Sequence, residues 1–319
     1  MSAGSEEPEA GAEGTTEPPH VGEGHTDSAA ATEAFVTHRN LLFTVAYEML
    51  GSAVDAEDVL QEAWLRWAGV DPAVVREPRA FLVRIVTRLA LDRLRALDRR
   101  KETYVGPWLP EPLLTTPDVA EDIELADSLS MAMLLVMETL APTERAVFVL
   151  REVFDVAYDE IAEAVGKSPA AVRQIAHRAR AHVAARRPRD AISAAETRAA
   201  LQAFQRAVET GDLQSLVDIL APNVVALSDG GGIRHAAVHP IVGADEVARY
   251  LAFGLTRFTA GMSIEPVQIN GRPGLVMRRA GEIHGVMAMR VEAGLITGLY
   301  TVRNPEKLSR LEQETVLSR

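Results

Sequence analysis

Four prolines fall within a short stretch of the sequence and prevent a continuous helix there. They are Pro107, Pro110, Pro112 and Pro117. On either side of this stretch, apolar residues recur with helical spacing, from Phe35 to Arg100 and from about Asp122 to Arg186. The sequence therefore predicts two all-α domains, joined by a proline-rich linker over residues 103–121.

The pattern changes after about Glu196. Helical segments are predicted first, over residues 196–210, 212–220 and 244–257. Strand-like runs follow at 263–269, 274–280, 284–292 and 295–302. Asn270-Gly271 and Ala293-Gly294 fit hairpin turns between these runs. Helices followed by an antiparallel meander predict an α+β domain over 196–319, after a short linker at 188–195.

The charge is segregated along the chain. The net charge is −12, but residues 1–34 carry eight acids and no Lys or Arg. Residues 76–102 carry nine Lys or Arg against four acids, and residues 166–189 carry seven and no acid. At moderate salt, screening weakens the electrostatic effect of a charge beyond about 10 Å. Both basic segments can therefore bind phosphate although the chain as a whole is acidic. Residues 1–31 have almost no large apolar side chains, and we expect a disordered acidic tail there.

Composition also excludes some classes of protein. The chain has no cysteine, which excludes disulfides and thiol chemistry. It contains no run of about 18 apolar residues and no signal-like N-terminus. We therefore expect a cytoplasmic protein that does not associate with a membrane.

The helix expected from Val54 to Trp67 has an acidic face. Leu60, Ala63, Trp64 and Trp67 cluster on one side at 100° per residue. The opposite side carries Asp55, Asp58, Gln61 and Glu62. On pattern alone, an ordinary amphipathic helix with a solvated acidic face explains this arrangement.

The segment from Ala80 to Arg99 has a basic face that needs more explanation. One stripe about 80° wide holds Arg84, Arg88, Arg95 and Arg99, together with Asp92. Like charges in one row repel each other and weaken an isolated helix. The row makes sense against an anionic partner, and nucleic acid is the natural one. A merely solvated basic face, or contact with an acidic protein surface, remains an alternative.

A helix-turn-helix is predicted within the second helical block. A helix opens at Pro142 and runs to about Val153. A short helix follows, over about 158–165, and Gly166 supplies the turn. Ser168 can cap the next helix, and the outward side chains there are Arg173, Gln174, His177, Arg178 and Arg180. Such a helix enters the major groove, where Arg reads guanine and Gln reads adenine. A structural helical hairpin is the alternative.

These segments resemble extracytoplasmic-function sigma factors over residues 35–186. Residues 55–66, Asp-Ala-Glu-Asp-Val-Leu-Gln-Glu-Ala-Trp-Leu-Arg, resemble the segment that docks on the β′ clamp of RNA polymerase. Residues 78–95 resemble the helix that melts and reads the −10 element, and the helix-turn-helix resembles the −35-reading domain. Many relatives carry Asn where Arg88 stands, near the pocket for a flipped −10 base. The resemblance therefore implies DNA contact by Arg88, but not base reading.

The resemblance implies a set of partners and residue roles. The partners are RNA polymerase core, through its β′ clamp and β flap, and promoter DNA at the −10 and −35 elements. Region two would span 32–102 and region four 122–187. Core binding would use Asp55, Asp58, Gln61 and Glu62. Contact with the −10 element would use Arg84, Arg88, Asp92, Arg95 and Arg99. Contact with the −35 element would use Ser168, Arg173, Gln174, His177, Arg178 and Arg180.

Three further motifs narrow the resemblance to a subgroup with a SnoaL-like, cone-shaped C-terminal extension. They are Trp108-Leu109-Pro110-Glu111-Pro112, the turn Asp229-Gly230-Gly231-Gly232, and Asn304-Pro305-Glu306-Lys307-Leu308, where relatives carry Asp in place of Glu306. In that subgroup the extension regulates in cis, which assigns a regulatory role to the last two motifs.

SnoaL-like folds also include enzymes, so catalysis is the rival function for the third domain. Acid–base candidates are His235, His239, His284, Asp229 and Asp245, but their spacing has no recognisable catalytic signature. We expect no enzyme activity, no cofactor and no metal site. A small ligand of the third domain stays open as a further partner, beside a domain that contacts protein only.

Overall fold

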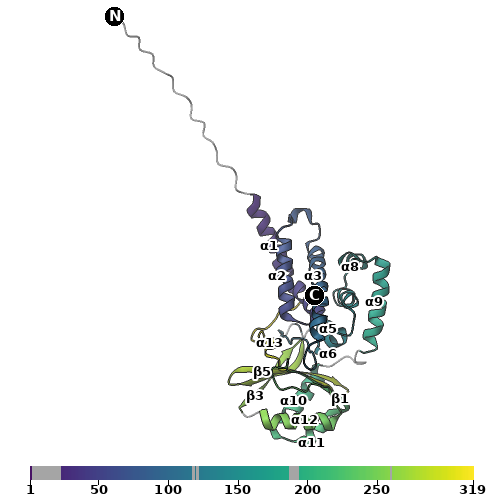
Figure 1. The fold of residues 1–319 in the computed structure, drawn as a ribbon, viewed down its shortest axis with the longest axis vertical. Coiled ribbons are helices and arrows are strands. Elements are labelled where there is room, and N and C mark those ends of the chain that lie inside the picture. The colour runs from purple at the N-terminus through teal and green to yellow at the C-terminus, as the bar shows by residue number, and fades with distance from the viewer. Residues whose placement is uncertain (2–22, 117–118, 120–121, 187–193, 259–260) are drawn as a thin grey trace.

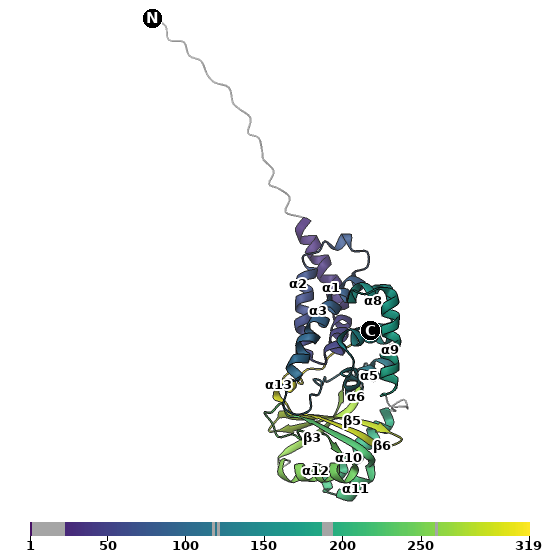
Figure 2. The same ribbon diagram turned by 45° about the vertical axis from the view of Figure 1, so that its right-hand side comes forward.

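The computed structural model describes Met1 and residues 23–116, 119, 122–186, 194–258 and 261–319. Two helical domains lie side by side, and an α+β domain packs against one end of both (Figure 1, Figure 2). The C-terminus returns from the α+β domain to lie among the helices (Figure 1). In these described ranges, no helix is long and apolar enough to cross a membrane.

The first helical domain contains α1 (Glu23–Leu50), α2 (Ala53–Trp67), the 3-10 turn η1 (Pro72–Val74) and α3 (Pro78–Lys101). Trp67 is fully buried, and its indole N–H donates to the carbonyl of Ala31 at 2.7 Å. Helix α1 begins at Glu23, so the prediction that residues 1–31 lack structure is wrong for 23–31. Tertiary packing on Ala31 supplies the burial that this segment's composition lacks. Residues 2–22 of the expected tail lie outside the described residues.

The second helical domain contains α5 (Ile123–Leu129), α6 (Met131–Met137), α7 (Pro142–Phe148), the π-helical turn η2 (Val149–Val153), α8 (Tyr158–Val165) and α9 (Pro169–Ala184). The predicted helix-turn-helix is confirmed as α8 and α9. Gly166 joins them with a φ of 67°, a left-handed conformation that glycine adopts without strain. Ser168 caps α9, and its hydroxyl accepts from the amide of Ala171 at 3.2 Å.

Residues 103–116 of the proline-rich segment form no helix, in agreement with the prediction that its prolines interrupt one, but they are closely packed. Leu109 and Leu113 are buried. Leu114 forms an antiparallel bridge with Ile269, and the amide of Thr315 donates to the carbonyl of Leu114 at 2.7 Å. The segment therefore contacts the α+β domain and the C-terminal residues instead of passing through solvent between the helical domains.

The α+β domain has a six-stranded mixed sheet in the order β2-β1-β6-β5-β4-β3. Its strands are β1 (Leu220–Asp229), β2 (Ile241–Val242), β3 (Met262–Ile269), β4 (Arg272–Arg279), β5 (Glu282–Glu292) and β6 (Leu295–Val302). Its helices are α10 (Ala194–Thr210), α11 (Leu213–Ile219), α12 (Ala244–Phe258) and α13 (Pro305–Leu308). The four predicted strands are confirmed as β3 to β6. Strand β1 was not predicted, because it pairs in parallel with the distant β6 and no hairpin turn marks it.

The two faces of this sheet pack against different parts of the chain. Leu275, Met287 and Leu299 belong to a core shared with α10, α11 and α12. Their strand neighbours Val276 and Tyr300 belong to a core shared with Leu109 of the linker and Met131 of α6. Since side chains alternate across a strand, the sheet joins its own helices on one face to the linker and the second helical domain on the other.

A buried carboxyl group lies where the two helical domains meet. Glu48 of α1 accepts from the hydroxyl of Ser128 at 2.6 Å, and the guanidinium of Arg145 donates to its backbone carbonyl at 3.0 Å. Burial raises the pKa of Glu48 to about 8, which the Ser128 hydrogen bond and the charge of Arg145 only partly oppose. Glu48 is therefore protonated in the folded protein at neutral pH.

The raised pKa of Glu48 predicts a pH-dependent stability. Between the unfolded value of 4.5 and the folded value of about 8, the native state binds the extra proton, so stability falls as pH rises. The slope should be about 1.4 kcal/mol per pH unit within this window. Glu48→Gln should flatten it in denaturant titrations between about pH 5 and pH 8. The exposed control Glu33→Gln should keep the wild-type slope, and an unchanged slope in Glu48→Gln would contradict the assignment.

Candidate functional site

The acidic face of α2 is only partly exposed. Asp58, Gln61 and Glu62 reach solvent, and the side chain of Asp58 is 51% exposed. Asp55 is buried instead, because Arg93 of α3 covers it and donates to its carboxylate at 2.6 Å. The expectation of an exposed acidic row is therefore wrong at Asp55, which ties α2 to α3. Arg93 also donates to Asp58 at 2.6 Å.

The basic face of α3 is divided between solvent and the second helical domain. Arg84 pairs with the carboxylate of Glu163 on α8 at 2.5 Å, and Arg88 donates to the Glu163 carbonyl at 2.8 Å. Arg95 pairs with Asp92 at 2.9 Å on the exposed part of the helix, where Arg99 is also exposed. Helix α8 thus occupies the part of the predicted −10 surface formed by Arg84 and Arg88.

Helix α9 presents its predicted DNA-reading side chains to solvent. Arg173, Gln174, His177 and Arg178 are all exposed. Arg180 is exposed but donates to Glu152 at 2.7 Å, and this hydrogen bond raises the pKa of Arg180. Ser168 acts as the N-cap, so its hydroxyl is used within the helix start. The outward row on α9 is available to a major groove in this arrangement.

Asp229, at the end of β1, binds the linker from the α+β domain. Its carboxylate is fully buried and accepts from the hydroxyl of Tyr104 at 2.5 Å and from the amide of Leu109 at 3.0 Å. The ammonium of Lys307 donates to the same carboxylate at 2.8 Å and to the carbonyl of Leu109 at 2.6 Å. Burial lowers the pKa of Lys307, and the charge of Asp229 opposes that shift.

The Asn304–Leu308 motif completes the contact from the start of α13. The side-chain amide of Asn304 donates to the Tyr104 hydroxyl at 2.8 Å, and its side-chain oxygen Oδ1 accepts from the backbone amide of Glu306 at 3.0 Å. The ammonium of Lys307 lies 3.5 Å from the centre of the Trp108 ring, a cation–π distance. Tyr104 and Trp108 are themselves in edge contact, with ring centres 4.6 Å apart. We call residues 104–109, Asp229 and Asn304–Lys307 the linker contact.

The glycines after Asp229 are required by close packing. A Cβ at Gly231, which has a φ of 63°, would lie 2.5 Å from the side-chain nitrogen of Asn304. At Gly230 it would overlap the carbonyl of Arg234. Gly232 also has a positive φ and lies against Val105 of the linker. The Gly-rich turn therefore permits Asp229 and Asn304 to approach the linker together.

Two other contacts join the α+β domain to the helical domains, and the sequence pattern did not single them out. Asn270 is fully buried, and its amide donates to the hydroxyl of Tyr47 at 2.7 Å and to the carbonyl of Leu129 at 3.0 Å. Arg272 forms an ion pair with Asp127. Asn270-Gly271 was predicted only as a hairpin turn, which it is. Its contact with the helical domains depends on the side chain of Asn270, which points out of the turn.

Glu111 connects the linker to the predicted polymerase-binding helix. Its carboxylate accepts from the hydroxyl of Ser52 at 2.9 Å and from the amide of Ala53 at 2.7 Å, at the first turn of α2. Its carbonyl accepts from the Tyr47 hydroxyl at 2.5 Å. A carboxylate at a helix start satisfies free amides and complements the helix dipole. The linker motif thus determines how α2 begins.

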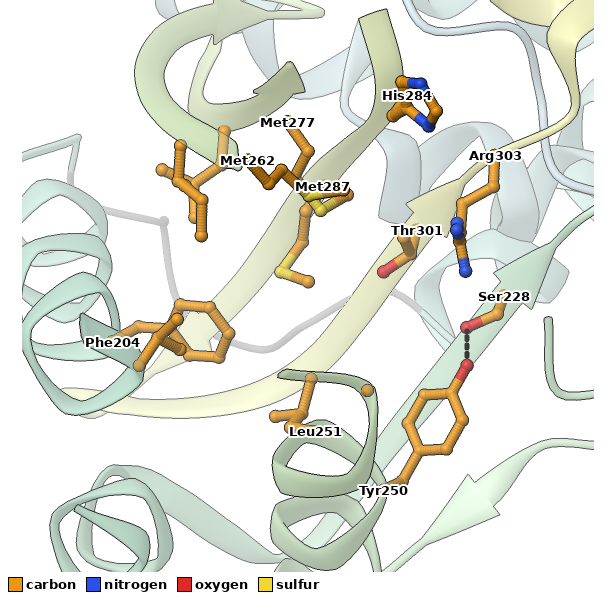
Figure 3. Close-up of a pocket in the computed structure, with 14 residues that line it drawn as sticks. Phe204, Ser228, Tyr250, Leu251, Met262, Met277, His284, Met287, Thr301 and Arg303 are labelled. Carbon is orange, nitrogen blue, oxygen red and sulfur yellow. Dashed lines mark hydrogen bonds between the residues drawn. The ribbon is translucent and has the colours of Figure 1, made fainter. Parts of the chain in front are cut away.

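A cavity of about 110 Å³ lies inside the α+β domain, between the sheet and helices α10 and α12 (Figure 3). Among the acid–base candidates, His284 lines it, whereas Asp229 faces the linker and His239 and Asp245 are exposed. None of the described residues that line the cavity is an acid. The His–carboxylate pair that the enzymatic alternative needs is therefore not formed there. The described residues also contain no cluster suited to a metal ion.

Comparison with known proteins agrees with this organisation. The family model for Sigma-70 region 2 matches residues 34–100, and the model for Sigma-70 region 4 matches residues 130–183. The ECF RNA polymerase sigma factor SigJ of Mycobacterium tuberculosis is 36% identical over 86% of this chain and 92% of its own length. The probable ECF sigma factor SigI of the same species is 31% identical over 88% of this chain and 96% of its own length. A crystal structure of SigJ matches with a TM-score of 0.70 and 33% identity, covering 87% of this chain and 98% of that one.

These matches define a class of protein and then a family within it. Regions 2 and 4 are the polymerase- and promoter-binding regions of sigma factors, which are initiation factors and not enzymes. The chain belongs to the extracytoplasmic-function sigma factor family and directs transcription initiation.

The acidic face of α2 leads to a test of polymerase binding. Asp58→Lys combined with Glu62→Lys should weaken binding to core polymerase, since like charges at an interface cost several kcal/mol. Both side chains are exposed, so the fold should survive. Affinity is measured by titrating labelled protein with core enzyme. Asp218→Lys with Asp245→Lys makes the same change in net charge on the α+β domain and should leave affinity unchanged. Equal affinity in both double variants would contradict the assignment.

The exposed row of α9 leads to a test of promoter reading. Arg173→Ala, Gln174→Ala and Arg178→Ala should each reduce promoter-specific initiation. Loss of a base-reading residue should cost about 1–3 kcal/mol and relax specificity at one position. Loss of a phosphate contact should instead weaken all sequences and reduce the salt dependence. Run-off transcription on a panel of promoter variants distinguishes the two, and wild-type behaviour of all three variants would show that α9 does not read DNA.

Proposed function

We propose that this sigma factor is regulated in cis by its C-terminal α+β domain, which binds the linker that connects the two helical domains. It acts in the cytoplasm on RNA polymerase core, through the β′ clamp and β flap. Asp58, Gln61 and Glu62 face the clamp, with Asp55 positioning α2 from beneath. The α3 arginines bind the −10 element, and the α9 residues bind the −35 element.

The compact arrangement of the helical domains argues that they must separate to work. The −10 and −35 elements lie about 25 base pairs apart, which is roughly 85 Å of B-DNA at 3.4 Å per base pair. In this structure Arg84 of α3 is within 2.5 Å of Glu163 on α8. A protein in this arrangement cannot place α3 and α9 on both elements at once. Separation requires the linker to leave its present position.

The linker contact is the observation that carries the proposal. Two motifs that are distant in the sequence, Asp229–Gly232 and Asn304–Leu308, converge on residues 104–109. Their hydrogen bonds engage both the backbone and the side chains of the linker. Covalent attachment raises the effective concentration of such a contact to roughly millimolar, so it would be mostly formed even if intrinsically weak.

The same domain also supports the helical domains through a separate set of contacts. Asn270 bonds to Tyr47 of the first domain and to Leu129 of the second. Leu317, near the C-terminus, belongs to the core of the helical domains. Loss of the whole domain would expose these surfaces. The α+β domain therefore has two roles. It inhibits transcription through the linker contact, and it stabilises the helical domains through Asn270 and its neighbours.

This division predicts opposite effects for release of the linker and for removal of the whole domain. Asp229→Ala should raise transcription by releasing the linker, while Asn270 and Leu317 keep their contacts with the helical domains. Truncation near Ala195 should lower transcription, because the helical domains lose a partner that orders them. Reporter assays at matched protein levels measure both outputs. Asp245→Ala, an exposed position of the same domain, should match wild type.

Other outcomes of these assays would contradict cis regulation or the supporting role of the domain. Equal output from all variants would show that the domain does not affect transcription. Higher output from the Ala195 truncation as well would reduce it to a simple inhibitor without a supporting role.

A second candidate function for the domain is the binding of a small molecule. The cavity favours it over contact with protein alone, because protein contact does not need an internal space. The absence of acids among the described lining residues favours binding over turnover.

A further inference from the structure

The cavity has an apolar side and a polar side. Figure 3 shows Phe204, Leu251 and three methionines gathered on one side, and Ser228, Tyr250 and Arg303 on the other. The methionines are Met262, Met277 and Met287. Methionine is flexible and polarizable, so this side can adapt to an apolar group of varied shape. The hydroxyls of Ser228 and Tyr250 lie 3.2 Å apart and form a polar edge beside Arg303.

The polar side places the guanidinium of Arg303 near the imidazole of His284. Arg234 donates to Nδ1 of His284 at 2.5 Å, and Arg303 donates to the carbonyl of His235 at 2.6 Å. Burial lowers the pKa of His284, and the charges of Arg234, Arg279 and Arg303 lower it further, while Glu282 opposes them. Burial and the charges of Arg234 and Arg279 likewise lower the pKa of Arg303. Since Nδ1 of His284 accepts a hydrogen bond, its Nε2 carries a proton that can be donated. A carboxylate placed here would lie beside the guanidinium of Arg303 and could accept a hydrogen bond from Nε2 of His284.

A glycine inside α12 keeps the cavity open. Gly254 lines the cavity in the interior of the helix, where glycine lowers helix stability. Its backbone has no positive φ, and nothing lies within 4 Å of a Cβ added to it. Packing therefore does not require glycine at this position. A larger side chain would project into space that now belongs to the cavity.

The cavity and the linker contact share two strand ends. Ser228 lines the cavity and Asp229, the next residue, holds the linker. Arg303 lines the cavity and Asn304, the next residue, bonds to Tyr104. The amides of Arg303 and Asn304 both donate to the carbonyl of Asp229, at 2.7 and 3.0 Å. A ligand that moves Arg303 would therefore move both residues that hold the linker.

We propose that this cavity binds a small amphipathic carboxylate, with its carboxylate on Arg303 and His284 and its apolar chain among the methionines and Phe204. The guanidinium fork of arginine matches a carboxylate. The cavity volume of about 110 Å³ restricts the ligand to a short chain. The regulatory consequence of binding rests on the proposed function, whereas the binding itself does not.

Calorimetric titration of the full-length protein with butanoate tests the site. Wild type should bind butanoate saturably, and butylamine, which has as many carbons and the opposite charge, should not bind. Arg303→Gln should weaken butanoate binding at least tenfold by removing the anchor. Gly254→Leu should weaken it to the same degree by filling the cavity, without removing any charge. Arg249→Gln, an exposed arginine of α12 paired with Glu246, is the matched control and should bind like wild type.

Thermal unfolding first establishes that each variant is folded. If Arg303→Gln does not fold, Gly254→Leu provides the test. Absence of saturable butanoate binding to wild type, equal binding of butylamine, or wild-type affinity in a folded Arg303→Gln or Gly254→Leu variant would each overturn the proposal. The titration contains neither polymerase nor DNA. Its failure is therefore distinguishable from failure of cis regulation, which the Asp229→Ala reporter assay measures.

Discussion

The buried pair of Asp229 and Lys307 is the interaction on which the arrangement of the three domains depends. Both side chains are removed from solvent, so each charge requires full compensation from its surroundings. The linker supplies much of it, since the Tyr104 hydroxyl and the Leu109 amide donate to Asp229 and the Leu109 carbonyl accepts from Lys307. A buried ion pair contributes little net stability compared with apolar packing, but a pair left incomplete is costly. This asymmetry makes the pair specific for one linker conformation, because departure of the linker removes the hydrogen bonds that Tyr104 and Leu109 supply to it.

The linker transmits that constraint to the polymerase-binding part of the molecule. Its backbone passes from the Asp229 contact at Leu109 to Glu111, whose carboxylate caps the first turn of α2. A few residues later, Leu114 pairs with the end of β3, and Thr115 donates to Gln268. The segment that separates the helical domains is therefore bonded to the α+β domain at residues 104–109 and 114–115, and to α2 in between. Movement of the linker would alter the cap of α2 as well as the spacing of the domains.

The sheet gives the α+β domain two independent surfaces. Alternation along β4, β5 and β6 places one set of side chains against α10–α12 and the other against the linker and α6. The cavity opens on the first side, and the helical domains pack on the second. Communication between them needs no long pathway, because consecutive residues at the ends of β1 and β6 belong to opposite sides. This geometry gives one small domain a cavity on one side and a contact surface for the helical domains on the other.

Local patterns in the sequence determined the elements, and tertiary structure determined which of them meet. The helix-turn-helix was predictable because Gly166, Ser168 and the apolar stripe of α9 act within a few residues of one another. Strands β3 to β6 were predictable for the same reason, since Asn270-Gly271 and Ala293-Gly294 mark turns between neighbours in the chain. The burial of Asp55, the packing of α1 at Ala31 and the parallel pairing of β1 with β6 were not, because each depends on a distant partner. The Asp229 and Asn304 motifs were recognisable in the sequence, but their common target was not: Asp229 and Leu109 are 120 positions apart, and only the folded chain brings a carboxylate, an ammonium group and a linker amide within hydrogen-bonding distance.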